Sequence, residues 1–392
     1  MKSTKAEKRI IFGGIFAVVI TLLLCTGICI AVSLSEGKNG GKTDVKLAEA
    51  ARVEKEVLEK DKLASSESLE IPEEKTEASE EEKAFEPLVI EKETSLYTYE
   101  QMEQDLQNMA LRYDDISIDS LGETMDGRQI YHVLIGNPQA SRHVMITGSI
   151  HAREYITTQL VMKQMNEFLK DEAAREKYLG QVAIHVVPMI NPDGVAISQM
   201  GLNGVKRPET RSYITDVIMK KDGSDGGESY FARWKANARG VDINRNFDAL
   251  WEQYVGSGHP SSDHYKGETP GSEPEAVALI SLTEKYPFVR TVSYHTQGEV
   301  IYWYFAQTGK LKTDTERFAT QISALTGYRL DDNYQNLDPA GYKDWAISKK
   351  KIPSLTIEVG RETSPVPSAQ FGEIWNKNSR VWNAVCDSAL EP

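Results

Sequence analysis

The sequence predicts an α/β fold in which helices cover both faces of a mixed, mostly parallel, twisted sheet. From about residue 96 onward, short apolar runs typical of strands alternate with amphipathic stretches typical of helices. The chain has 392 residues, of which 40% are hydrophobic, and its six tryptophans and seventeen tyrosines suit a large core. We therefore expect one globular domain over residues 96–390.

The N-terminal residues differ in composition from this domain. Residues 1–9 are basic, and residues 10–34 form an uncharged apolar stretch that is long enough to cross a bilayer as a helix. The basic flank predicts a cytoplasmic N-terminus and an exported remainder. A long signal peptide cleaved near residue 32 is the alternative, and it also exports the chain. We expect a single-pass protein of the cell membrane with an extracytoplasmic domain, or a secreted protein if this segment is cleaved.

Residues 35–95 are rich in Glu, Lys and Ser and nearly free of aromatic side chains, so they cannot bury a core. We expect a disordered, charged stalk between the membrane and the globular domain. The net charge of -13 offers no electrostatic basis for binding nucleic acid. Cys386 is the only cysteine after the apolar segment, so the exported part forms no intramolecular disulfide.

The elements of the globular region follow in order. An amphipathic, helix-like stretch at 97–115 begins it. Strand-like runs stand at 130–136, 143–150, 182–190, 291–296 and 354–360, and longer helix-like stretches stand at 157–172 and 274–286. In open sheets of this class, ligands gather at the carboxyl ends of strands. His151, the "NPDG" at 191–194, His295 and Glu358 fall at or just after such ends.

His151 and Glu154 form a His-x-x-Glu pattern that suggests a metal site. In isolation the pattern is weak, because a buried histidine beside a helix-starting carboxylate explains it equally well. A catalytic zinc needs three protein ligands and one open position. The candidates for the third ligand are His132, His143, His185, His259, His264 and His295. Of these, His295 stands at a strand end, whereas the others lie within strand-like runs or in a loop.

Five motifs occur together in one order: "SIHAREY", "NPDG", "GVDINRNF", "SYHTQGE" and "LTIEVG". Together they resemble the zinc metallocarboxypeptidase family, the M14 peptidases or funnelins, over residues 97–389. The resemblance implies a zinc carboxypeptidase-like fold and one Zn²⁺ ion, with His151, Glu154 and His295 as its ligands. It also implies that Glu358 is the catalytic base that takes a proton from zinc-activated water. The alternative for Glu358 is a glutamate on an edge strand that faces solvent.

The resemblance also implies residues that bind substrate. Asn244 and Arg245 match the family residues that hold the C-terminal carboxylate, a task that suits the planar fork of arginine. Arg153 matches an auxiliary arginine that contacts substrate. A surface arginine in a turn is the ordinary alternative for Arg245.

The chain departs from the family pattern at two places. Where many relatives carry an arginine that stabilises the oxyanion, this chain has Lys235, and Arg239 is a second candidate. The position of the family's mobile tyrosine holds Asn336, which leaves Tyr334 as the nearest candidate and Tyr342 as the alternative.

The floor of the family's specificity pocket falls on Lys343, counted from Glu358. A lysine there would attract a carboxylate on the substrate side chain, as in Glu, Asp or the diaminopimelate-type residue of peptidoglycan stem peptides. Its alternative is a lysine that points to solvent from a charged loop.

The sequence thus predicts a zinc-dependent metallocarboxypeptidase that hydrolyses a peptide bond near a free C-terminal carboxylate. A peptidase or amidase acting on cell-wall peptides of the γ-D-glutamyl-diaminopimelate type is the alternative. A binding module without activity is a further alternative, but neither a ligand nor the glutamate is missing.

Overall fold

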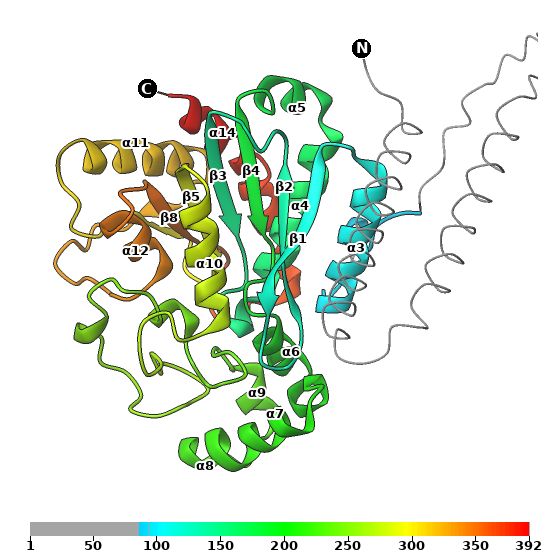
Figure 1. The fold of residues 1–392 in the computed structure, drawn as a ribbon, viewed down its shortest axis with the longest axis vertical. Coiled ribbons are helices and arrows are strands. Elements are labelled where there is room, and N and C mark those ends of the chain that lie inside the picture. The colour runs from blue at the N-terminus through cyan, green and yellow to red at the C-terminus, as the bar shows by residue number, and fades with distance from the viewer. Residues whose placement is uncertain (1–85, 93, 392) are drawn as a thin grey trace, which may run out of the picture. The chain divides into compact units, whose positions relative to one another are not determined.

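The computed structural model describes residues 86–92 and 94–391 of the chain (Figure 1). The predicted cytoplasmic N-terminus (1–9), the predicted transmembrane segment (10–34) and most of the predicted stalk (35–85) lie outside the described residues. Within the described part of the chain, no helix combines the length and the apolar character needed to span a bilayer.

The last residues of the predicted stalk pack against the domain. Leu88 and Ile90 are buried, and the backbone N–H groups of Val89 and Ile90 donate to the carboxylate of Asp105 at 2.7 and 2.8 Å. Asp105 lies on helix α3 (Tyr99–Arg112), which buries its apolar face in the same core. The packed region therefore starts before residue 96, because two apolar side chains in a polar stretch suffice to anchor it.

Eight strands form one sheet with the order β1-β2-β4-β3-β5-β8-β6-β7. Its four central strands, β4, β3, β5 and β8, run parallel to their neighbours within that group. The pairs β1–β2, β2–β4 and β6–β8 are antiparallel, and β7 pairs with β6 in parallel. The predicted mixed α/β fold is confirmed. The strands are β1 (Ile116–Glu123), β2 (Gln129–Ile135), β3 (Arg142–Thr147), β4 (Val182–Val187), β5 (Phe288–His295), β6 (Val300–Tyr302), β7 (Arg329–Leu330) and β8 (Ser354–Glu358).

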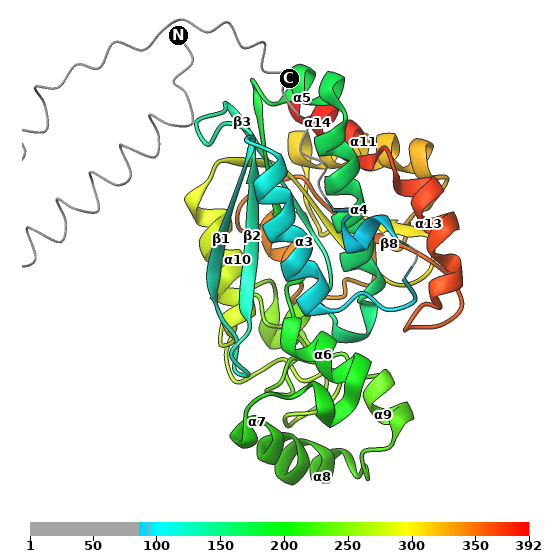
Figure 2. The ribbon, with the colours of Figure 1, turned by 90° about the vertical axis from the view of Figure 1, so that its right-hand side faces the viewer.

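Helices cover both faces of the sheet, as Figures 1 and 2 show. Helices α3, α4, α11 and α14 contact one face, and α10 and α12 contact the other. Besides α3, the helices are α4 (Ile156–Lys170), α5 (Glu172–Tyr178), α6 (Pro192–Met200), α7 (Pro208–Tyr213), α8 (Met219–Asp222), α9 (Glu228–Ala232), α10 (Pro274–Lys285), α11 (Gly309–Thr326), α12 (Tyr342–Ser348), α13 (Phe371–Asn378) and α14 (Val381–Leu390).

The central strands are buried on both faces, which explains why their sequences are continuous apolar runs. On β3, Val144 and Ile146 join the core beneath α4 and α14, whereas Met145 joins the core beneath α10 and α12. Because both faces are covered, solvent reaches the sheet at its strand ends. This geometry leaves the carboxyl ends of β3, β5 and β8 as the place for a site.

Three buried histidines form a chain across β2, β4 and β3. His132 Nε2 lies 2.9 Å from His185 Nδ1, and His185 Nε2 lies 2.9 Å from His143 Nδ1. His143 Nε2 lies 3.1 Å from the carbonyl oxygen of Ala140. Neutral rings satisfy this arrangement. In each ring one nitrogen then donates a hydrogen bond, and the other nitrogen either accepts one or has no partner in the chain of histidines. These rings lie away from the carboxyl ends of the strands, and they are not among the groups of described residues that could hold a metal ion.

We predict that this chain of histidines makes the fold sensitive to acid. Burial lowers the pKa of His132 to about 4 and that of His185 to about 2. An unfolded histidine titrates near pH 6.5, so below that pH the unfolded chain binds protons that the folded chain does not. As the pH falls from 6.5 to 4, each of the two histidines therefore lowers the free energy of unfolding by up to about 1.4 kcal/mol per pH unit.

Urea unfolding of the chelator-treated protein at several pH values in that range measures this slope. The variant His132→Gln keeps an N–H donor but cannot titrate, so its slope should be shallower than that of the wild type. His264→Gln alters an exposed histidine and serves as the control with an unchanged slope. Equal slopes in all three proteins would contradict the prediction.

Candidate metal centre

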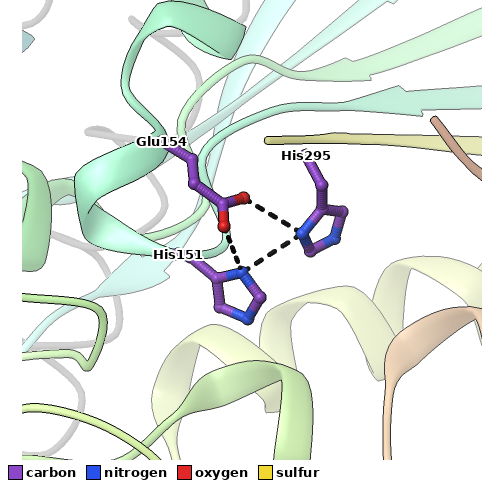
Figure 3. Close-up of side chains that lie close together, drawn as sticks. All are labelled: His151, Glu154 and His295. Atoms are coloured by element: carbon purple, nitrogen blue, oxygen red, sulfur yellow. Dashed lines mark hydrogen bonds and ion pairs between the residues drawn. The ribbon is translucent and has the colours of Figure 1, made fainter. Parts of the chain in front are cut away.

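Three side chains meet at the carboxyl ends of neighbouring strands. His151 follows β3, Glu154 ends the short 3₁₀ turn Ala152–Glu154, and His295 is the last residue of β5. Strands β3 and β5 pair in parallel, so their carboxyl ends lie at the same edge of the sheet. The short turn after His151 brings Glu154 back to the same point, as Figure 3 shows.

The donor atoms of these side chains converge. Glu154 Oε1 lies 2.9 Å from His151 Nδ1, and Glu154 Oε2 lies 3.1 Å from His295 Nδ1. The two Nδ1 atoms are 3.2 Å apart, and all three side chains are buried. Two imidazole nitrogens and a carboxylate that face one point are a common ligand set for zinc. The residues present therefore fit a zinc ion.

The electrostatics agree with a cation site. Burial favours the neutral acid, yet the imidazoles of His151 and His295 hold the pKa of Glu154 well below its usual range. Burial also opposes a charge on His295, but the carboxylates of Glu154 and Glu358 raise its pKa above the ordinary value. Glu154 and Glu358 thus create a negative potential where the donor atoms converge, and such a potential favours the binding of a divalent cation.

Asp242 is a residue of this centre that the sequence analysis missed. Its Oδ1 lies 3.2 Å from His151 Nε2, on the ring nitrogen opposite the one that faces Glu154. A carboxylate in this place orients the ring so that Nδ1 points to the metal. Burial disfavours the charge of Asp242, but Lys235 and then His151 hold its pKa well below the usual range. Its place in "GVDINRNF", beside Asn244 and Arg245, is the signal from which it could have been found.

Glu358 ends β8 and lies beside His295 in the register of β5 and β8. It lines the same pocket as the three candidate ligands. Burial raises the pKa of Glu358 to about 8, and the positive charges of His295, Lys235 and Arg245 offset only part of that effect. The structure therefore does not support the reading of Glu358 as an edge-strand residue in solvent.

The pocket has a volume of about 520 Å³ and collects most of the predicted site residues. Those that line it are His151, Arg153, Glu154, Lys235, Asn244, Arg245, His295, Lys343 and Glu358. Arg239, Tyr334 and Tyr342 are not among its lining residues. The aromatic side chains at its wall are instead Tyr302, Tyr304 and Phe305, which the sequence analysis did not single out.

Of the two candidate oxyanion cations, the structure brings Lys235 into the pocket. Its ammonium group lies 2.9 Å from Asp242 Oδ2 and 3.6 Å from Asp263 Oδ1. Arg239 points elsewhere and pairs with Glu273, with Nε and Oε2 3.4 Å apart. Arg239 lies within a tight turn, in which the N–H of Gly240 donates to the carbonyl oxygen of Asn237 at 3.1 Å.

Neither tyrosine candidate faces the pocket. The Tyr334 ring packs edge-on against Tyr304, with ring centroids 4.8 Å apart, on the loop after β7. Tyr342 is fully buried, and its hydroxyl lies 2.9 Å from that of Thr283. It belongs to the core that α12 covers and does not line the pocket. Asn336, at the family's tyrosine position, does line the pocket.

Lys343 also points inward rather than to solvent. Its Nζ donates to Asp344 Oδ1 at 2.5 Å and to the carbonyl oxygen of Tyr304 at 3.3 Å. Its side chain is only 12% exposed. The pocket therefore has a charged floor.

Comparison with known proteins identifies the family. Residues 102–381 match the family of M14 peptidases, described as zinc carboxypeptidase. The chain belongs to the zinc carboxypeptidase family. It is therefore a zinc metallopeptidase, and the predicted family and zinc cofactor are confirmed.

Two proteins of the zinc carboxypeptidase family are similar in sequence to most of the globular part of the chain. The chain is 32% identical to γ-D-glutamyl-L-diamino acid endopeptidase 1 of Lysinibacillus sphaericus, over 72% of this chain and 70% of that protein. It is 30% identical to carboxypeptidase B of Astacus astacus, over 68% of this chain and 86% of that protein. The solved structure of carboxypeptidase A from Helicoverpa armigera has the same fold, with a TM-score of 0.60 at 18% identity over 76% of this chain and 75% of the other.

We predict that His295→Ala removes the zinc ion, because two remaining donors hold it far more weakly than three. Elemental analysis of the purified protein should give about one zinc for the wild type and much less for this variant. His264→Ala is the matched control, because His264 stands in a second group of acids and histidine, with Asp242 and Asp263. Retention of zinc by His295→Ala, or its loss from His264→Ala, would overturn the ligand assignment.

Proposed function

We propose that this zinc metallopeptidase hydrolyses the bond to a diamino acid, near a free C-terminal carboxylate, in stem peptides of peptidoglycan. The observation that carries the substrate class is Lys343, a cation inside the specificity pocket. The relative from Lysinibacillus sphaericus supports the proposal, because its name gives a γ-D-glutamyl-L-diamino acid bond as the one that it cleaves. Carboxypeptidase B of Astacus astacus supports the broader alternative, an enzyme that removes the terminal residue of ordinary peptides.

His151, Glu154 and His295 would hold the zinc ion, which would supply an acidified water molecule and polarise the scissile carbonyl group. Asp242 keeps the His151 ring in the orientation that presents Nδ1. All four of these side chains are buried, which limits the access of solvent to the ligand atoms.

Glu358 transfers the proton. Burial raises its pKa to about 8, and a divalent cation held close by would lower that pKa. A carboxyl group poised near neutral pH accepts a proton from the attacking water and donates it to the leaving amine. Lys235 supplies positive charge to the developing oxyanion, as a buried ammonium group held by Asp242 and Asp263.

Asn244 and Arg245 bind the terminal carboxylate of the substrate, and Arg153 is an auxiliary contact. Asn244 Oδ1 accepts a hydrogen bond from the backbone N–H of Tyr342 at 3.0 Å, which fixes the orientation of the amide and leaves its NH₂ group for a ligand. The guanidinium group of Arg245 lies over the Tyr254 ring, 4.8 Å from its centroid. Both side chains are thus held in place before a substrate arrives.

Lys343 selects the side chain. A substrate side chain with a carboxylate gains a charged hydrogen bond from the Lys343 ammonium, whereas an apolar or purely cationic one gains none. Diaminopimelate-type residues carry such a carboxylate. The proposed location fits this substrate, because a membrane segment at 10–34 would place the domain outside the cytoplasm, where cell-wall peptides are found.

We predict that Glu358→Gln keeps the fold and the zinc ion but loses activity about 10²–10⁴-fold, because a positioned general base contributes about that much. Steady-state kinetics on a stem-peptide substrate gives the loss in kcat/KM, and circular dichroism and elemental analysis check fold and metal. Glu362→Gln, which changes an exposed glutamate in the following loop, is the control. Activity near that of the wild type would refute the proton-transfer role.

A second prediction concerns Lys343. Replacement by alanine should lower kcat/KM about tenfold or more for a terminal diaminopimelate and leave a terminal norleucine nearly unaffected, because only the former offers a carboxylate. Lys349→Ala, which removes an exposed lysine at the end of the same helix, is the matched control. If the wild type prefers Phe or Arg, or if Lys343→Ala leaves the ranking unchanged, the substrate class is wrong.

A further inference from the structure

The guanidinium group that the proposed function assigns to the substrate carboxylate is paired with a carboxylate of its own chain. Arg245 Nη2 donates to Asp338 Oδ2 at 2.5 Å. Arg245 is nearly buried, with 10% of its side chain exposed, whereas the side chain of Asp338 is 70% exposed. Both residues line the pocket. Asp338 therefore covers the Arg245 guanidinium group from the solvent side, at the position proposed for the substrate carboxylate.

Asp338 lies on the loop that joins β7 to α12. The ends of this loop are fixed: the N–H of Asp331 donates to Ile301 O, and the N–H of Ala340 donates to Ala249 O, both at 2.9 Å. Within the loop, the hydrogen bonds from Asn333 and Asn336 are local and long, at 3.5 and 3.4 Å. A loop held in this way at its ends can shift its middle without breaking strand or helix.

The pair between Asp338 and Arg245 is suited to exchange. An ion pair with one strongly exposed partner stabilises the fold only weakly, because water competes for the exposed group. An incoming carboxylate can therefore replace Asp338 on Arg245 at little cost. The displaced Asp338 then has a free negative charge at the pocket wall. The Lys343 ammonium donates to Asp344 and to the carbonyl oxygen of Tyr304, which leaves one of its three N–H donors for a substrate carboxylate.

We propose that Asp338 is a specificity-determining residue. On substrate binding it gives up its ion pair with Arg245 and forms a new one with an ammonium group on the side chain of the substrate's terminal residue. When the substrate binds, its terminal carboxylate pairs with Arg245 in place of Asp338. The ammonium group of its side chain then pairs with Asp338, and the carboxylate of its side chain binds Lys343. A residue with both groups at the end of its side chain satisfies all three, so a diamino dicarboxylic acid is favoured. This inference rests on the proposed function and adds to it the recognition of the amine.

Four peptides that differ only in the terminal residue test the proposal. Diaminopimelate carries the side-chain amine and carboxylate, 2-aminopimelate only the carboxylate, lysine only the amine, and norleucine neither. The zinc-loaded full chain in detergent should cleave the diaminopimelate peptide with a kcat/KM about tenfold or more above that for 2-aminopimelate. In Asp338→Asn this ratio should fall to near one, while the ratio between diaminopimelate and lysine, which reports on Lys343, should persist.

A second measurement isolates the exchange itself. In calorimetry with N-acetylnorleucine, a ligand with one carboxylate and no amine, Asp338→Asn should bind about three- to tenfold more tightly than the wild type, because no internal carboxylate competes for Arg245. Asp332→Asn removes the same charge from an exposed position on the same loop that does not line the pocket. It should match the wild type in both measurements.

The outcomes separate the two proposals. If Asp338→Asn leaves both the diaminopimelate to 2-aminopimelate ratio and the affinity for N-acetylnorleucine unchanged, the role of Asp338 is refuted while the peptidase assignment stands. If the wild type cleaves norleucine as well as lysine and diaminopimelate, recognition of the amine is refuted. If none of the four peptides is cleaved, the proposed function fails, and an unchanged affinity in calorimetry then refutes the exchange on its own.

Discussion

The parallel pairing of β5 with both β3 and β8 is the constraint on which the site depends. In this arrangement His295 at the end of β5 lies opposite Glu358 at the end of β8, and the chain that leaves β3 carries His151 and Glu154 to the same edge. A shift of one residue in either pairing would turn a side chain to the opposite face of the sheet, because side chains alternate along a strand. The cores on both faces hold the register, since the central strands bury side chains toward α10 and α12 as well as toward α4 and α14.

A dense set of buried charges is the second feature of the centre. Acids at Glu154, Asp242 and Glu358 are interleaved with Lys235 and Arg245, and nearly all of these side chains are shielded from water. Buried charges cost free energy unless each finds a partner. A divalent cation held by the two imidazoles and Glu154 would offset part of that cost, so metal binding would also stabilise this region.

The pocket beside the metal centre combines aromatic and charged side chains. Its wall has aromatic rings at Tyr302 and Tyr304, while its floor carries the ion pair of Lys343 and Asp344. An apolar side chain that enters such a pocket displaces water from these charged groups and offers them no hydrogen bond in return, which costs free energy. The loop after β7, which brings Asp338 to Arg245, adds a further charge at the entrance.

The sequence alone determined the fold class, the family and the chemistry of the centre. Alternating apolar runs predict helices and strands, and the five ordered motifs identify His151, Glu154, His295, Glu358, Asn244 and Arg245, because these side chains occupy fixed places in short segments. The tertiary structure decided which cation, Lys235 or Arg239, enters the pocket, and it buried Tyr342 in the core. It also revealed Asp242 behind His151 and Asp338 on Arg245. These facts depend on the direction in which a loop side chain points and on contacts between segments distant along the chain, and neither periodicity nor spacing encodes them.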